Sequence, residues 1–218
     1  MSKKSRKVRS PKPRQETPEG VRFVEYEITS ETIQDRRYQQ LPEYVKDTID
    51  RLHFEAQRKP RQAIPELEKL VETYPDIPVL YNYLGVAYSL SGNQQKAEEI
   101  VLENIKRNPN YLFARLNYAE ICLAKHEYKK VKEIFDNKLE LSLLYPHRKR
   151  FHTSEVIGFM SVIGRYLLGI GERDAAEKYY ELLKKISPDS LQTKQLGKLL
   201  HPNLLVRLLS HLFPPNSR

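Results

Sequence analysis

Apolar side chains recur at intervals of three and four residues along most of this chain, and the clearest example spans residues 79–110. One stripe there follows i, i+3, i+4 and i+7, which is the spacing of an amphipathic helix. A turn at residues 91–93 separates it from a second stripe, which ends at Pro109 because proline cannot continue a helix. The pattern therefore predicts two antiparallel helices. The first stripe consists of Tyr81, Leu84, Gly85 and Tyr88, and the second of Ala97, Ile100, Val101 and Ile105.

The same two-helix pattern recurs along the chain. Ala63 and Pro75 precede Ala97 and Pro109 by 34 residues, so one helix pair comes before the clearest one. A further pair follows at the same spacing. The next is displaced by 45 residues, which leaves an insertion of 11 residues between about 137 and 153. Internal repeats of this length are typical of solenoid proteins. We therefore expect four helix pairs, at residues 41–76, 78–111, 112–152 and 155–189.

These repeats resemble the tetratricopeptide repeat (TPR) family. The family pattern is an aromatic residue, then Leu-Gly, a tyrosine, a small residue opening the second helix and a closing proline. In this chain the places are held by Tyr81, Leu84, Gly85, Tyr88, Ala97 and Pro109. The resemblance covers residues 41 to about 200. It implies an all-α fold, a right-handed α-solenoid of antiparallel helix pairs with capping helices within residues 191–218.

Some stretches depart from the regular repeat. The first pair carries Asp50 and Arg51 at the Leu-Gly places, so we expect it to pack irregularly or to cap the array. In the third pair Arg115 occupies the aromatic place, and the insertion predicts a longer second helix, broken near Pro146 and followed by a basic loop. Residues 21–29 alternate like a short strand with no evident partner, within an extended segment and linker at 21–40.

Composition narrows the classes of function. Of the 218 residues, 39% are hydrophobic and 30% are charged, and no apolar run reaches the ~20 residues needed to span a bilayer. A single cysteine excludes an internal disulfide, and the basic N-terminus lacks the apolar core of a secretion signal. We expect a cytoplasmic protein, or a nuclear one in a eukaryotic host. The sequence has no phosphate-binding glycine loop, metal-ligand cluster or catalytic constellation, so it predicts a non-enzymatic protein without cofactor or metal.

The resemblance also implies where a ligand would bind. In this family the concave face is formed by the first helix of each pair and holds a peptide or helix of a partner protein. Here that face is mainly apolar with a few amides and two opposite charges, which favours an amphipathic helix or an extended apolar peptide. The alternative is that several of these positions only pack against neighbouring helices or line an unused surface. The predicted groove residues are Asn82, Val86, Phe113, Leu116, Asn117, Glu120, Ser161 and Arg165.

The net charge of +9 is concentrated at the N-terminus. Residues 1–16 carry seven Lys or Arg and one Glu, a net charge of +6 that leaves +3 for the rest. Residues 1–20 lack large apolar side chains, so we expect a disordered basic tail. The tail is a solvated segment, an import signal, or a contact with nucleic acid or the ribosome, which gives an alternative function as a nucleic-acid-associated adaptor. Its predicted contacts are Lys3, Lys4, Arg6, Lys7, Arg9, Arg148, Lys149 and Arg150.

Leucines form a stripe near the C-terminal end of the chain. A solenoid needs its last apolar face covered, so the first interpretation is a capping helix. The alternatives are a helix that pairs two copies into a homodimer or binds another protein, and a membrane-surface helix, which a single arginine on the polar side disfavours. The stripe consists of Leu204, Leu205, Leu208, Leu209 and Leu212.

Overall fold

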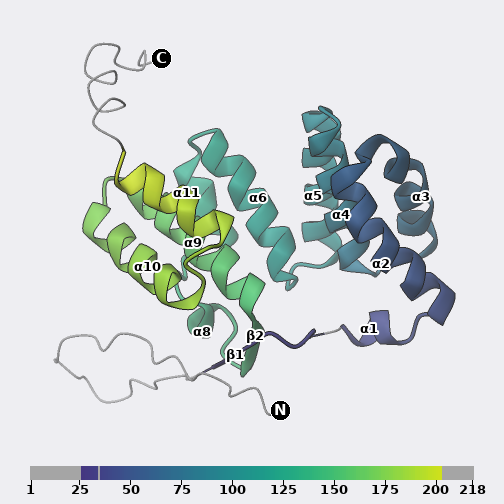
Figure 1. Cartoon of the computed structure of the whole chain (residues 1–218), viewed down its shortest axis with the longest axis horizontal. Coiled ribbons are helices and arrows are strands. Elements are labelled where there is room, and N and C mark those ends of the chain that lie inside the picture. The colour runs from purple at the N-terminus through teal and green to yellow at the C-terminus, as the bar shows by residue number, and fades with distance from the viewer. Residues whose placement is uncertain (1–25, 34, 203–218) are drawn as a thin grey trace.

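The computed structural model describes residues 26–33 and 35–202. Within them the chain is an all-α TPR-like solenoid with one small parallel sheet (Figure 1). The predicted fold class is thereby confirmed. Two sets of predictions lie outside the described residues, namely the tail contacts Lys3, Lys4, Arg6, Lys7 and Arg9 and the leucine stripe that begins at Leu204.

The first half of the solenoid contains two helix pairs. α2 (Glu43–Arg58) and α3 (Pro60–Thr73) form one pair, and α4 (Pro78–Leu90) and α5 (Gln94–Arg107) form the next. Proline opens α3 and α4, where its missing N–H costs no helical hydrogen bond. The apolar stripes of these helices meet in one core, which includes Ile49, Leu52, Leu67, Leu80 and Leu84.

The second half contains the remaining helices. α6 (Leu112–Ala124) is followed by the short helices α7 (Tyr128–Ile134) and α8 (Leu141–Leu144). α9 (Thr153–Gly169) pairs with α10 (Arg173–Ile186), and α11 (Leu191–Leu200) packs against both. These elements share a second core, to which α11 contributes Leu196 and Leu200. Both leucines are completely buried, so α11 covers apolar surface of the last pair.

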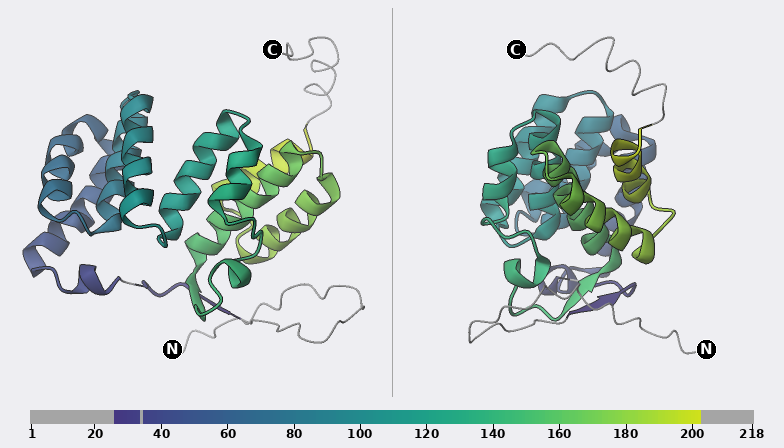
Figure 2. Two further views of the ribbon diagram at one scale, coloured as in Figure 1. Left: turned by 180° about the vertical axis from the view of Figure 1, so that it is seen from behind. Right: turned by 90° about the vertical axis from the view of Figure 1, so that its left-hand side faces the viewer.

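The two cores are separate, and the break falls between α4 and α6. Asn82, Leu116 and Ser161 occupy equivalent positions in successive pairs. Leu116 and Ser161 are 4% and 1% exposed, whereas Asn82 is only half-buried. The first helices therefore pack closely from α6 onward but spread apart between α4 and α6, as Figures 1 and 2 show. We call α2–α5 the N-terminal lobe and α6–α11 the C-terminal lobe.

The insertion in the third pair differs from the prediction. The sequence predicts a longer second helix, and this is wrong, because α7 has only 7 residues. Asp136 and Asn137 adopt left-handed backbone conformations, with φ of 53° and 59°, which a right-handed helix cannot contain. Arg115 holds this end, since its Nη1 donates to the carbonyl of Ile134 at 3.1 Å and to Asp136 Oδ2 at 2.9 Å. The arginine at the aromatic place thus fixes where α7 ends.

Of the strand predicted at residues 21–29, residues 21–25 lie outside the described part of the chain, and the end that is described has a partner, contrary to the expectation. β1 (Glu27–Thr29) pairs in parallel with β2 (Arg150–His152), which lies in the insertion directly before α9. Three residues at the end of a charged loop carry no strand signal that a sequence pattern would detect. From β1 the chain crosses to α1 (Arg36–Gln39) at the N-terminal lobe (Figure 2). We call residues 27–33 and 35–39 the strap, because Ile28 packs against the second core and Tyr38 against the first.

Candidate functional site

The inner face of the N-terminal lobe carries a pocket of about 520 Å³ between α2 and α4. Two predicted groove residues, Asn82 and Val86, line this pocket, and both are half-buried. Leu90 lines it as well, with 58% of its surface exposed. We call this the groove pocket. It offers apolar surface with an amide at one side.

Aromatic rings add flat surface to the groove pocket. The ring of His53 is stacked on that of Tyr83, with centroids 4.8 Å apart, and also on that of Phe54, at 5.0 Å. Stacked rings of this kind present a broad contact area that loses little side-chain entropy on binding. Neither His53 nor Tyr83 is among the predicted groove residues. The repeat could have indicated Tyr83, because it precedes the predicted Asn117 by 34 residues.

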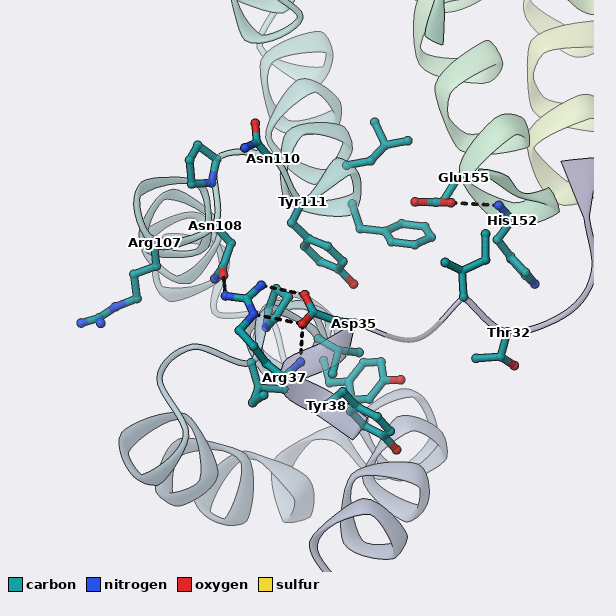
Figure 3. A pocket seen from close by; sticks show the side chains of 18 of the residues that line it. Thr32, Asp35, Arg37, Tyr38, Arg107, Asn108, Asn110, Tyr111, His152 and Glu155 are labelled. Atoms are coloured by element: carbon teal, nitrogen blue, oxygen red, sulfur yellow. Dashed lines mark hydrogen bonds and ion pairs between the residues drawn. The ribbon is translucent and has the colours of Figure 1, made fainter. Parts of the chain in front are cut away.

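A second pocket, of about 680 Å³, lies between the two lobes beside the strap (Figure 3). The N-terminal lobe contributes Val79 and Tyr83, the C-terminal lobe contributes Phe113 and Glu155, and the strap contributes Asp35. Phe113 is one of the predicted groove residues. Tyr83 lines both pockets, so the two adjoin. We call the second one the junction pocket.

The polar groove residues are brought together in pairs. Asn117 donates from Nδ2 to Asn82 Oδ1, across the break between α4 and α6. Further along the inner face, Arg165 of α9 forms an ion pair with Glu120 of α6. Each pair links two successive first helices. Because these polar groups are already satisfied within the chain, the surface left for a ligand on this face is mostly apolar.

Two of the predicted groove residues, Leu116 and Ser161, lie in the core instead of on the groove surface. Their position in the repeat directs both side chains toward the first helix of the next pair. In the C-terminal lobe these first helices pack closely. A Cβ atom on Gly158 of α9 would lie 3.0 Å from Leu116 Cδ1. The Ser161 hydroxyl has no hydrogen-bond partner among the described residues. A ligand could reach neither side chain without separating helices.

The two arginines of the predicted basic loop, Arg148 and Arg150, are paired within the protein, whereas the side chain of Lys149 is exposed. Arg148 donates from Nη1 and Nη2 to the carboxylate of Glu155, at 2.9 and 2.6 Å. Arg150 pairs with Glu31 of the strap at 3.0 Å. The carbonyl of Lys149 accepts a hydrogen bond from the backbone of β1 at 2.8 Å. This loop therefore fastens the strap to the C-terminal lobe, and its contact with nucleic acid stays a prediction.

Burial sets the protonation of the side chains around the junction pocket. Desolvation raises the pKa of Tyr83 to about 12 and also raises the pKa of Tyr111. The negative charges of Glu155 and Asp35 act on Tyr111 in the same direction. Hydrogen bonds from Arg37 lower the pKa of the Asp35 carboxyl. At neutral pH both tyrosines are thus neutral hydrogen-bonding groups, and Asp35 is an anion.

A metal-ligand cluster and an exposed thiol are both absent from the described residues. Within residues 26–33 and 35–202 no three His, Cys, Asp or Glu side chains are grouped as metal ligands would be. Cys122 is completely buried, and burial raises the pKa of its thiol, so it lies in the core as a neutral side chain. No helix in the same part of the chain combines the length and the apolar character that crossing a membrane requires.

The chain is similar to the TPR repeat-containing protein YvcD of Bacillus subtilis (strain 168). The two are 31% identical over 110 residues, which make up 50% of this chain and 22% of that protein. The matched part is therefore about a fifth of the relative's length. No family model and no solved structure matches the chain. The relative confirms the resemblance to TPR proteins that the repeat residues indicate.

Proposed function

Because the chain is a TPR-like repeat protein, we propose that it is a non-enzymatic scaffold that binds a peptide or a helix of a partner protein along its inner face. The observation that carries the proposal is the groove pocket, on the face that the TPR resemblance assigns to ligands. Val86 and Leu90 present apolar surface there, and burial of such surface drives most protein association.

The partner segment should be apolar and carry few charges where it touches the inner face. The polar side chains of this face are used in the Asn82–Asn117 and Glu120–Arg165 pairs, so a charged ligand would find no free counter-charge in them. Aromatic surfaces, here Tyr83, are typical centres of binding energy in protein interfaces. An amphipathic helix or an extended apolar segment fits this description.

Replacing Val86 by glutamate tests the proposal, because a bound partner would cover the new charge and remove it from water. Leu102→Glu is the matched control, since Leu102 is 42% exposed on α5, the second helix of the same pair. The partner is first isolated from the native cell and identified by mass spectrometry, and its affinity is then measured by calorimetry. We expect Val86→Glu to weaken binding by about tenfold or more and Leu102→Glu to leave it unchanged, with similar Tm values. Equal affinities in the two variants would contradict binding in this groove.

A further inference from the structure

The junction pocket is built from three parts of the chain that are distant in sequence. Val79 comes from the first turn of α4, Tyr111 from the residue before α6, and Glu155 from the first turn of α9. The strap adds Ile33, which is 41% exposed at the pocket. Both lobes and the strap therefore form its walls.

The carboxylates that line the junction pocket are hydrogen-bonded within the chain. Asp35 accepts hydrogen bonds from Arg37 Nε and Nη2 at 3.0 and 2.7 Å, and Glu155 accepts two from Arg148. The third lining carboxylate, Asp50, accepts a hydrogen bond at 3.0 Å from a strap tyrosine. Arg107, the third lining arginine, forms its ion pair with Glu103, which does not line the pocket. Each of the three lining carboxylates thus has a hydrogen-bond partner within the chain, and none is left unpaired to select a cationic ligand.

Apolar and polar side chains both contribute surface to the junction pocket, with Thr32 and Asn110 among the polar ones. Its apolar surface comes mainly from Ile33 and from the half-buried Val79 and Phe113, whereas Ile77 and Leu112 line it with only 4% and 1% of their surface exposed. The Tyr111 hydroxyl points into the pocket and makes no hydrogen bond to the other residues drawn in Figure 3. The volume of about 680 Å³ lies within the range of small-ligand pockets, roughly 300–1,000 Å³. One bulky side chain and the backbone next to it would fit there.

The strap is fastened at both of its ends. On the C-terminal lobe β1 pairs with β2, and Thr153 Oγ1 donates to the carbonyl of Thr29 at 3.0 Å. On the N-terminal lobe Arg37 Nη1 donates to Asn108 Oδ1 at 2.9 Å. Between these two attachments the strap runs along the end of the junction where α6 and α9 begin (Figures 1 and 2). Its residues Thr32, Ile33 and Asp35 form one wall of the pocket there.

We propose that the junction pocket is a second binding site, which takes one uncharged aromatic or branched aliphatic side chain, and that the strap closes over it. The inference rests on the proposed function, because this side chain belongs to the partner on the inner face, which adjoins the pocket at Tyr83. The side chain is buried between the two lobes, and a carbonyl of the partner accepts a hydrogen bond from Tyr111. Binding therefore also holds the lobes at one angle.

Capped amino acids probe this pocket without the natural partner. N-acetyl-L-leucinamide and N-acetyl-L-tryptophanamide are titrated into the full chain, and the methyl resonances are followed by NMR. We expect saturable shifts at Ile77, Val79 and Leu112, and affinities at least about fivefold weaker for N-acetyl-L-lysinamide and for the α-amide of N-acetyl-L-glutamate. No saturable shift at these methyls, or equal binding of the charged probes, would overturn the proposal.

Matched variants separate the two pockets. Val79→Trp fills the junction pocket from its α4 wall, whereas Val86→Trp puts the same side chain into the groove pocket. We expect the first to abolish the probe shifts at Leu112 and the second to retain them. Tyr111→Phe removes only the hydroxyl and should weaken probe binding severalfold, which provides a test even if Val79→Trp does not fold. Unchanged probe affinity in Tyr111→Phe together with a retained Leu112 shift in Val79→Trp would overturn the assignment.

The covering role of the strap has a separate measurement. Arg37→Ala removes the side-chain hydrogen bonds to Asn108 and to Asp35 and should raise the dissociation rate of the bound probe severalfold, as NMR line shapes report. An unchanged rate would show that the strap does not close the pocket. Failure of this inference is distinguishable from failure of the proposed function. A partner that loses affinity for Val86→Glu but binds Val79→Trp as tightly as the natural chain uses the groove pocket alone.

Discussion

Arg37 of the strap donates a hydrogen bond from Nη1 to Asn108 Oδ1 at 2.9 Å, across 71 positions in the chain. Asn108 is buried, and its Nδ2 donates to Asn104 Oδ1 at 3.1 Å. Asn104 is buried too, and it donates to the carbonyl of Pro78 at 3.1 Å. Buried amides need such partners, because an unsatisfied polar group loses its hydration without compensation. Three consecutive hydrogen bonds thus tie the strap to the start of α4.

Asn108→Ala should therefore loosen the strap and destabilise the N-terminal lobe. We expect the free energy of unfolding to fall by about 1–3 kcal/mol, because Asn104 and Arg37 both lose a partner. Urea denaturation measures this loss, and the substitution should increase the rate of amide hydrogen exchange more in α1 than in α3. Asn110→Ala is the control, since Asn110 is exposed two residues away, and it should change stability by less than about 0.5 kcal/mol. Similar stabilities of the two variants would contradict a structural role for this network.

Glu155→Gln should be the more damaging of two changes in the loop that holds the strap. Glu155 is 6% exposed, and its carboxylate accepts two hydrogen bonds from Arg148 and one from the backbone of His152 at 2.9 Å. Removing one charge of a largely buried pair leaves the other uncompensated. We expect a loss of about 3 kcal/mol in the free energy of unfolding, measured by urea denaturation.

Arg150→Ala supplies the comparison for that loss. Arg150 also forms ion pairs, with Glu27 at 3.5 Å and with Glu31 at 3.0 Å, but half of its side chain is exposed. Exposed pairs contribute little, because water screens them and ordering long side chains costs entropy. We expect less than about 1 kcal/mol for this change. If both variants lost the same stability, burial would not distinguish the Arg148–Glu155 pair from the ion pairs of Arg150.

The repeat was predictable from the sequence because it is local. The stripe of Tyr81, Leu84 and Tyr88 specifies one face of one helix, and equivalent stripes recur at a fixed spacing. The TPR resemblance, which rests on these repeat positions, assigns Val86 and Phe113 to the inner face. It cannot tell which of these positions neighbouring helices cover, because that depends on how far successive helices spread apart.

The strap and the junction pocket were not predictable for the opposite reason. β1 and β2 have three residues each and lie more than a hundred positions apart, so no short window of sequence contains both. Tyr111 and Asp35 meet only because the strap returns to the N-terminal lobe. In the sequence, Arg115 is only a departure from the repeat pattern at the aromatic place. Its role at the end of α7 depends on a turn that the sequence pattern does not encode.

The hydrogen bonds that Asp35 accepts at the start of α1 should be lost at low pH. The Asp35 carboxylate accepts hydrogen bonds from the Arg37 side chain and, at 2.8 Å, from the Arg37 backbone N–H, and these lower the pKa of Asp35. A carboxyl with a lowered folded-state pKa stabilises the fold above its unfolded pKa of about 3.9, and that stabilisation is lost as pH falls through the folded value.

The Arg37 amide proton reports this change by NMR. Its chemical shift should stay constant from pH 7 to about 4 and move at lower pH, with a midpoint below that of an unstructured aspartate. In Asp35→Asn the pH-dependent movement should be absent. A midpoint above about 4 in the natural chain would show that the carboxylate is not stabilised in this way.

Gly85 and Gly164 occupy the same place in the repeat, yet the structure predicts opposite outcomes when each is replaced by alanine. A Cβ atom on Gly85 would meet Val101 Cγ2 at 3.5 Å, which is ordinary contact. One on Gly164 would lie 2.6 Å from Cδ2 of Leu196, a completely buried residue of α11. Gly85→Ala should be neutral or stabilise by up to about 1 kcal/mol, since alanine favours helix. Gly164→Ala should destabilise by about 1–3 kcal/mol, because an overfilled core forces its neighbours to move.

A double-mutant cycle locates the cause of that loss. If the added methyl group acts by displacing Leu196, then Gly164→Ala combined with Leu196→Ala should cost less than the sum of the two single changes. Denaturation of the four proteins in urea gives the coupling free energy, which we expect to exceed about 0.5 kcal/mol. If the losses in the free energy of unfolding were additive, the added methyl group would not act by displacing Leu196. Coupling of the expected sign would establish that the glycine is required here by the close approach of α11, which Gly85 does not have to accommodate.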